Sequence, residues 1–141
     1  MNESRAEHQR AILDTSALIL IDRMPGVEFL PRLPLITAIS LAELSVGPLV
    51  VRDDVERARR VARLQRVEAA FNPLPFGVEA AGAYGGVAAS LRNAGRKVEA
   101  RRGDAMIAAV ALSKELPVYT CNPRDFEGID GLEVVPVPVP V

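Results

Sequence analysis

Short continuous apolar runs alternate with longer segments of helical period along this chain. The apolar runs have the length of strands. The first run ends at Leu13, and the others cover 35–38, 117–121 and 132–135. Helical spacing predicts helices over 17–21, from Ser40, over 53–71, over 77–93 and from Asp104. Strands that alternate with helices predict an α/β sandwich around a mainly parallel sheet.

Turn residues divide this pattern. Gly47-Pro48 should interrupt the helix that begins at Ser40, because proline has no backbone N–H to donate. Met24-Pro25-Gly26 predicts a turn after the first helix. We expect a mobile polar tail over 1–10, one domain over 11–135 and an extended proline–valine tail over 136–141.

The clearest helical period lies in residues 53–71. Its apolar residues recur at steps of three and four: Val55, Ala58, Val61, Leu64, Val67 and Phe71. The other faces are rich in arginine, at Arg57, Arg59, Arg60, Arg63 and Arg66. We interpret these arginines as a solvated face with local Glu–Arg pairs rather than as a nucleic-acid contact.

Composition narrows the possible chemistry. The 141 residues are 49% hydrophobic, which is enough for a core, and no apolar run reaches the roughly 18 residues of a membrane span. A single cysteine, Cys121, and a single histidine, His8, argue against a zinc site and against Ser-His or Cys-His catalysis. The net charge of −1 means that any nucleic-acid binding must rest on a local patch.

Four carboxylates occupy matching places in the predicted layout. Asp14 ends the first strand and Asp125 follows the third, while Glu43 lies one turn into the helix after the second strand and Asp104 begins a helix. Sites in parallel α/β sheets form at the carboxyl ends of the strands, so these acids, with Asn122, could converge. Carboxylates gathered in one cleft remain ionised together only with a cation among them. Mg²⁺ or Mn²⁺ suits that role and could support phosphodiester hydrolysis.

Each acid also has a purely structural interpretation. Asp14 and Asp104 both precede apolar helical runs and could be N-caps. Ser40-Leu41-Ala42-Glu43 matches a capping box, which would explain Glu43 without a metal. Asp125 could be a turn residue. Taken singly these interpretations are favoured, but the order and spacing of all four acids favour a shared site.

The segments around the four acids resemble the sequence motifs of PIN-domain ribonucleases. The length of the chain is similar to that of the VapC toxins of bacterial VapBC toxin–antitoxin pairs. ILDTSALI resembles the first motif, ISLAEL the second, GDAMIAAVAL the third and VYTCNPRDFEGIDGLEVV the last. The resemblance covers roughly residues 11–135. It implies a three-layer α/β/α sandwich with a central mainly parallel sheet.

The resemblance also implies a function. We expect a Mg²⁺- or Mn²⁺-dependent endoribonuclease of the bacterial cytoplasm, a homodimer neutralised by a cognate VapB-type antitoxin. By position, Asp14, Glu43 and Asp104 should be metal ligands and Asp125 the fourth acid. Asn122 stands where many PIN proteins carry an acid, so occupancy of a second metal site depends on whether Asp125 compensates.

Other residues near the acids have supporting roles in this interpretation. Hydroxyl groups should orient the carboxylates, at Thr15, Ser16 and Thr120. Three arginines are candidates for contacts with RNA phosphates or are solvated surface groups, at Arg101, Arg102 and Arg124.

Two other classes remain open. A haloacid-dehalogenase-like phosphatase would need a second acid where Ser16 stands, and a receiver domain would need an acidic pair and a lysine that are not evident. A catalytically degenerate PIN domain, acting as an RNA-binding or assembly module, is the non-enzymatic alternative.

Overall fold

A computed structural model describes residues 9–21 and 29–139 of the chain. Its elements in order are β1 (Arg10–Leu13), α2 (Thr15–Leu20), β2 (Leu33–Leu35), α3 (Ala38–Val46), η3 (Gly47–Leu49), α4 (Asp54–Ala70), α5 (Val78–Asn93), η4 (Glu99–Arg101), α6 (Arg102–Lys114), β3 (Val118–Thr120), η5 (Pro123–Phe126) and β4 (Val134–Pro136).

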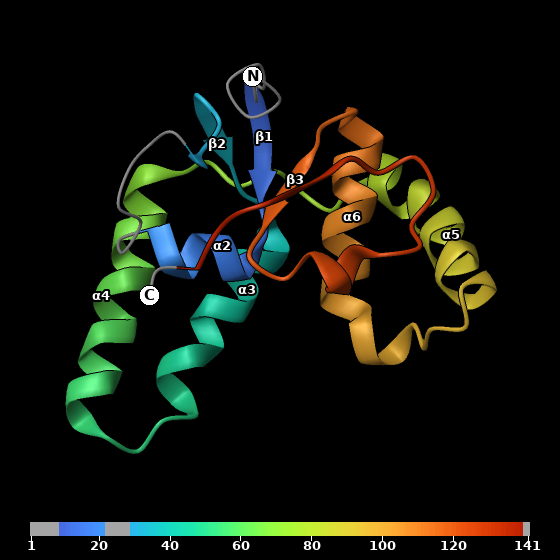
Figure 1. The fold of residues 1–141 in the computed structure, drawn as a ribbon. Helices are drawn as coiled ribbons and strands as arrows, with labels where there is room; N and C mark the ends of the chain where they lie inside the picture. Colours follow the sequence, from blue (N-terminus) through green and yellow to red (C-terminus); the bar gives the residue numbers. More distant parts are fainter. Residues whose placement is uncertain (1–8, 22–28, 140–141) are drawn as a thin grey trace.

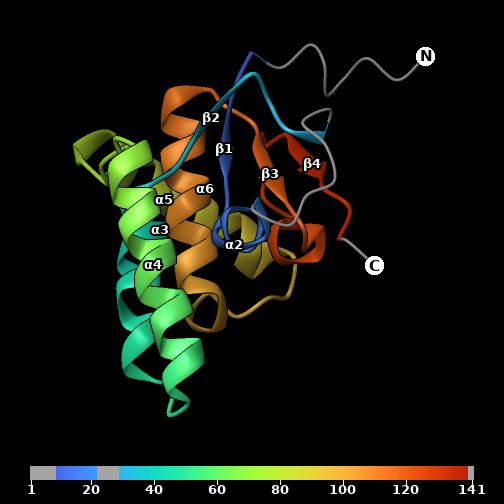
Figure 2. The same cartoon turned by 90° about the vertical axis from the view of Figure 1, so that its left-hand side faces the viewer.

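The four strands form one sheet in the order β2-β1-β3-β4, and every pairing between these strands is parallel. Ile12 is in register with Leu35 on one side and with Val118 on the other. Figure 2 shows β4 beside β3 at one edge of this sheet. The predicted parallel α/β architecture is therefore confirmed.

Alternate residues of the strands pack into two separate hydrophobic clusters. Ile12 and Val118 pack with residues of α5 and α6. Leu13 and Tyr119, the next residues along, pack with residues of α2, α3 and α4. This period of two is the side-chain alternation of a strand. Figure 1 shows the result, with α4 on one side of the sheet and α5 and α6 on the other.

Local signals place most element boundaries. Asp14 and Asp53 have extended backbones and cap α2 and α4, the latter through a hydrogen bond of 2.8 Å from the Glu56 amide to Asp53 Oδ2. Helix α3 ends at Val46, directly before Gly47-Pro48, as predicted. Leu74 forms an isolated bridge with Thr37 in the connection between α4 and α5.

Three expected boundaries are wrong by a few residues. Strand β2 lies at Leu33–Leu35 rather than at 35–38 and includes Pro34, which an edge strand tolerates. Helix α3 begins at Ala38 because Thr37, not Ser40, is its N-cap. The last strand ends at Pro136. The turn expected at 24–26 and residues 1–8 of the expected N-terminal tail lie outside the described residues. The expected C-terminal tail is described to residue 139, and its first part packs on the sheet, because Pro136 belongs to β4 and the Val137 amide donates to the Thr120 carbonyl at 2.8 Å.

None of the helices within residues 9–21 and 29–139 is both long enough and apolar enough to cross a membrane.

Candidate functional site

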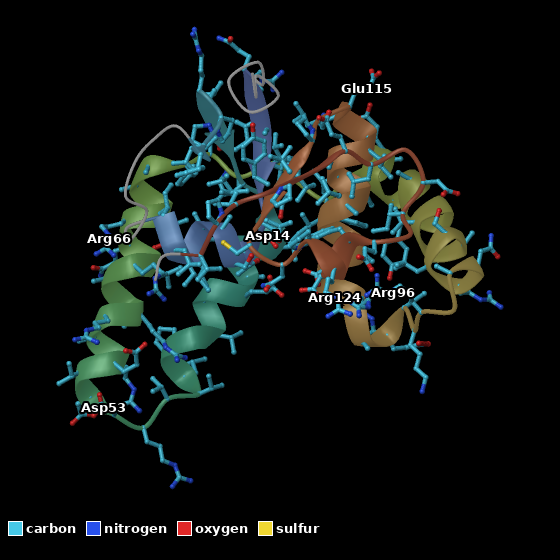
Figure 3. All side chains as sticks on the ribbon, viewed as in Figure 1. Asp14, Asp53, Arg66, Arg96, Glu115 and Arg124 are labelled. Carbon is cyan, nitrogen blue, oxygen red and sulfur yellow. The ribbon has the colours of Figure 1, made fainter. Side chains whose placement is uncertain are left out.

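A cleft of about 600 Å³ opens at the carboxyl edge of the sheet. All four predicted acids and Asn122 line it, although they come from four separate segments of the chain. Figure 3 shows the first of them, Asp14, near the centre of the molecule, with α3 and α4 on one side and α6 on the other. The full lining is Asp14, Thr15, Ser16, Ile19, Glu43, Leu44, Gly47, Glu56, Arg60, Arg63, Asp104, Asn122 and Asp125.

Asp14 follows β1 directly and is only 3% exposed. Its Oδ1 accepts hydrogen bonds from Ser16 Oγ at 2.7 Å and from the Ala17 amide at 2.9 Å. Its Oδ2 accepts one from Thr120 Oγ1 at 2.6 Å. The N-cap interpretation of Asp14 is thus correct, but the carboxylate also belongs to the cleft.

The same hydroxyl groups hold the loop after β3 in place. Thr120 Oγ1 accepts a hydrogen bond from the Asn122 amide at 2.9 Å, and Ser16 Oγ accepts one from the Cys121 amide at 3.1 Å. Asn122 and Asp125 are therefore positioned by a network that also fixes the Asp14 carboxylate.

Glu43 lies inside α3, and its carboxylate takes no part in a capping box. The cap of this helix is the Thr37 hydroxyl, which accepts from the Ser40 amide at 3.4 Å. The hydroxyl of Thr15 donates to Glu43 Oε1 and lies 2.8 Å from Ser40 Oγ. Thr15 thereby ties α2 to α3 and holds the Glu43 carboxylate toward the cleft.

Asp104 is the third residue of α6, so the interpretation of Asp104 as an N-cap is wrong. Burial, followed by the charges of Asp125, Asp14 and Glu43, raises the pKa of this carboxyl group to about 7. Arg101 opposes the shift. The pKa of Asp14 is also raised, mainly by burial, with a contribution from Asp125.

Asp125 lies in η5 and forms an ion pair with a neighbouring arginine. Arg101 Nη1 donates to Asp125 Oδ1 at 3.1 Å, and both side chains are partly exposed. The Asp125 carboxylate therefore interacts with a cation rather than serving as a plain turn residue. Arg102 and Arg124 are exposed and do not line the cleft.

The donor set fits a hard divalent cation. The lining offers carboxylate and amide oxygens, which Mg²⁺ and Mn²⁺ prefer, and neighbouring carboxylates add to the raised pKa of both Asp104 and Asp14. Within the described residues, no three acidic, imidazole or thiol groups are already gathered closely enough to hold an ion. Binding would therefore draw the carboxylates closer or use bridging water, as Mg²⁺ usually does.

Three residues of α4 in the lining were not expected there: Glu56, Arg60 and Arg63. Residues 57, 59 and 66 are exposed as predicted for a solvated face, but Arg60 and Arg63 are partly buried in the cleft. The helical steps from 56 to 60 to 63 continue along the helix to buried Val67. Positions 56, 60 and 63 thus share a helix face with buried Val67. This shared face is the sequence feature that could have indicated that these residues face the protein interior.

Comparison with known proteins gives consistent results. Residues 11–132 match the model of the PIN domain family. The chain is 37% identical over 128 residues to Ribonuclease VapC5 of Mycobacterium tuberculosis, covering 89% of this chain and 92% of the relative. It is 34% identical over 104 residues to a Ribonuclease VapC of Rickettsia bellii, covering 74% and 76%.

Solved structures show the same fold. A crystal structure of VapBC-5 from M. tuberculosis, a member of the VapBC family of toxin–antitoxin systems, contains a chain with a TM-score of 0.79 and 35% identity, covering 92% of this chain and 99% of that one. A DNA-bound VapBC structure from Salmonella typhimurium gives a TM-score of 0.72 and 28% identity, covering 90% and 96%.

Proposed function

Because this chain belongs to the PIN-domain family, among the VapC ribonucleases of VapBC toxin–antitoxin systems, we propose that its cleft hydrolyses RNA phosphodiester bonds with the help of Mg²⁺ or Mn²⁺. The supporting observation is the convergence of Asp14, Glu43, Asp104 and Asp125 in one cleft, although the chain separates them widely. Burial first, and repulsion from the other acids second, raise the pKa of Asp104, and a divalent cation would relieve both by favouring the ionised carboxylate.

Asp14, Glu43 and Asp104 would hold the ion, with Asp125 and Asn122 completing the set of oxygen donors. When bound, such an ion supplies Lewis acidity toward a phosphate and lowers the pKa of a bound water. Other side chains of this chain hold the carboxylates in position before substrate binds.

The surrounding hydroxyl groups and Arg101 hold the acids in position. Thr120 and Ser16 fix the orientation of the Asp14 carboxylate, and Thr15 fixes that of Glu43. Arg101 holds the Asp125 carboxylate in position through its ion pair. Arg102 and Arg124 remain candidates for steering RNA phosphates, and Arg101 could do so only in addition to its contact with Asp125.

We extend the proposal to partners and location. The solved relatives are described as VapBC toxin–antitoxin structures, which supports a cognate VapB-type antitoxin for this chain, seated so that it blocks the cleft. A homodimer acting in the bacterial cytoplasm, where RNA is available, completes the proposal.

The test is cleavage of total bacterial RNA by antitoxin-free protein with Mg²⁺, with Mn²⁺ and with EDTA. We expect discrete fragments that require the ion. Asp104→Asn and Glu43→Gln, which keep the shape of the side chains but remove a charge, should abolish cleavage and weaken Mn²⁺ binding in calorimetry, with an unchanged circular dichroism spectrum.

Full turnover by either variant would refute the assignment of these acids. If folded wild-type protein cleaves nothing with either ion but still binds RNA, the chain is instead a catalytically degenerate binding module.

A further inference from the structure

Helix α4 contributes two arginines to the cleft, one turn apart. Arg60 is held in a defined position, because its Nε lies 3.1 Å from Glu56 Oε2 and its Nη1 donates to the Gly47 carbonyl at 3.0 Å. Its side chain is 32% exposed, compared with 70% for Arg59, which lies on the same helix and is not among the residues that line the cleft. Arg60 is therefore oriented by its own neighbours rather than free in solvent.

Arg63 is one turn further along and has a polar atom without a partner. Its Nε is buried and has no hydrogen-bond acceptor among the described residues, the only such buried side-chain atom in this part of the chain. A guanidinium group cannot lose its proton in a protein, so this donor stays charged and unsatisfied. Buried donors normally have an acceptor, so the missing acceptor points to a ligand.

The charge distribution of the cleft indicates what that ligand is. A divalent cation would offset part of the charge of the four acids under the proposed function. On the α4 wall Glu56 is paired with Arg60, so Arg63 carries the positive charge that has no acidic partner there among the described residues. An elongated polyanion would meet the cation at one phosphate and the arginines at another. Guanidinium groups bind phosphate oxygens through two parallel hydrogen bonds, which an ammonium group cannot do.

We propose that Arg63, supported by Arg60, is the binding site for a phosphate of the RNA strand next to the one that is cleaved. The inference rests on the proposed nuclease function. It adds that the sugar–phosphate backbone of the substrate runs along the α4 side of the cleft. In this arrangement α4 selects a polynucleotide over a small phosphate ester, because two phosphates must be engaged at once.

A packing role for Arg63 must be separated from phosphate binding. The residue also lines a second, more apolar groove with Leu18, Val67 and Phe71, so its aliphatic stem could contribute packing alone. Arg63→Met keeps an apolar stem and removes the charge, whereas Arg63→Lys keeps the charge and removes the planar fork. Arg59→Met is the matched control, because Arg59 lies on the same helix and outside the cleft. Its contact with a cleft residue is a 3.7 Å approach to Glu56 Oε1, whereas Arg60 binds the other oxygen at 3.1 Å.

The experiment measures binding of a short single-stranded RNA to the full chain carrying Asp104→Asn, by fluorescence anisotropy at several salt concentrations. Arg63→Met should weaken binding roughly tenfold and reduce the slope of log K against log salt by about 0.7, the contribution of one phosphate contact to a single strand. Arg59→Met should change neither quantity, and Arg63→Lys should keep the slope with a weaker affinity.

In the active protein, Arg63→Met should raise KM for RNA while the affinity for Mn²⁺ stays as in wild type. Equal affinity and slope for Arg63→Met and Arg59→Met would overturn the inference, provided that wild-type protein cleaves RNA. Absence of any metal-dependent cleavage by wild type would instead be the failure of the proposed function. If Arg63→Met does not fold, Arg63→Lys decides: unchanged affinity would exclude a bidentate phosphate contact.

Discussion

The absence of a side chain at Gly103 determines where the Glu43 carboxylate lies. A Cβ atom at this position would fall 2.7 Å from Glu43 Oε2, which is closer than such atoms pack. Gly103 precedes Asp104 in the first turn of α6, so the space it leaves is beside two acids of the site. Glu43 is exposed and its side chain is flexible, so an added methyl group would displace the carboxylate without disturbing the core.

Gly103→Ala should therefore weaken the binding of Mn²⁺ by roughly tenfold, the lower end of the effect of groups that orient metal ligands. Its melting temperature without metal should not fall, since alanine suits a helix better than glycine. Calorimetric titration and thermal denaturation measure the two quantities. Gly86→Ala is the control, because a Cβ there meets nothing. Wild-type Mn²⁺ affinity in Gly103→Ala would contradict the argument.

The acids and the hydroxyl groups that support them can be predicted from the sequence, but which hydroxyl group supports which acid cannot. Each of the four acids belongs to a short local motif beside a strand end or in the first turns of a helix, and such short-range patterns are visible in one sequence. The hydrogen bond from Thr120 to Asp14 joins residues 106 positions apart. Such pairing depends on which strands become neighbours, which no local pattern specifies.

At the scale of elements, helix α6 ends in a strained residue. Glu115 has φ 56° and ψ 44°, the left-handed conformation that favours glycine. The Leu116 amide donates to the Ala111 carbonyl at 2.9 Å and the Glu115 amide donates to the Leu112 carbonyl at 3.2 Å, which together form a Schellman ending. The chain thus adopts a glycine-type helix ending without glycine.

Glu115→Gly should raise the free energy of unfolding by up to about 1 kcal/mol, because relief of the left-handed strain exceeds the extra entropy of the unfolded chain. Urea denaturation monitored by circular dichroism measures the change. Lys114→Gly, one residue earlier and within the helix, should lower the same quantity by about 1 kcal/mol. Equal destabilisation by both substitutions would show that position 115 is not strained.

Whether a segment forms a helix or a strand was easier to predict than which of its side chains face the cleft. The alternation of strands and helices follows from periodicity, and α4 was predicted over almost its full length. The inward placement of Arg60 and Arg63 was not, because a helix rich in charge has several polar faces and only tertiary packing decides which one meets the cleft. The sequence pattern misplaces strand β2 because it puts a strand boundary at Pro34, whereas an edge strand accepts proline.

At the scale of the whole molecule, the acids of the cleft make stability depend on pH and on cations. The carboxyl group of Asp104 has an ordinary pKa of 3.8, and its pKa is about 7 in the folded protein. The folded state therefore binds more protons than the unfolded state between these values. Asp14, whose pKa is also raised, acts in the same direction.

Without a divalent cation, the melting temperature should fall as the pH rises from about 4 to about 7 and should level off above. Mg²⁺ added at pH 8 should raise it, because the ion binds the folded site. Asp104→Asn should flatten the pH dependence and reduce the response to Mg²⁺. Differential scanning calorimetry tests all three statements. A melting temperature that rises through this range in EDTA would contradict the sign.

The separation of Asp14 and Thr120 along the chain also constrains when activity can begin. A growing polypeptide leaves the ribosome from its N-terminal end, so Asp14 emerges long before the strand that supports it. The third and fourth acids and β3 follow only after residue 103. No shorter nascent chain contains a complete cleft, so nuclease activity can begin only when nearly the whole domain has been made. An inhibitor that binds before that point would prevent any activity.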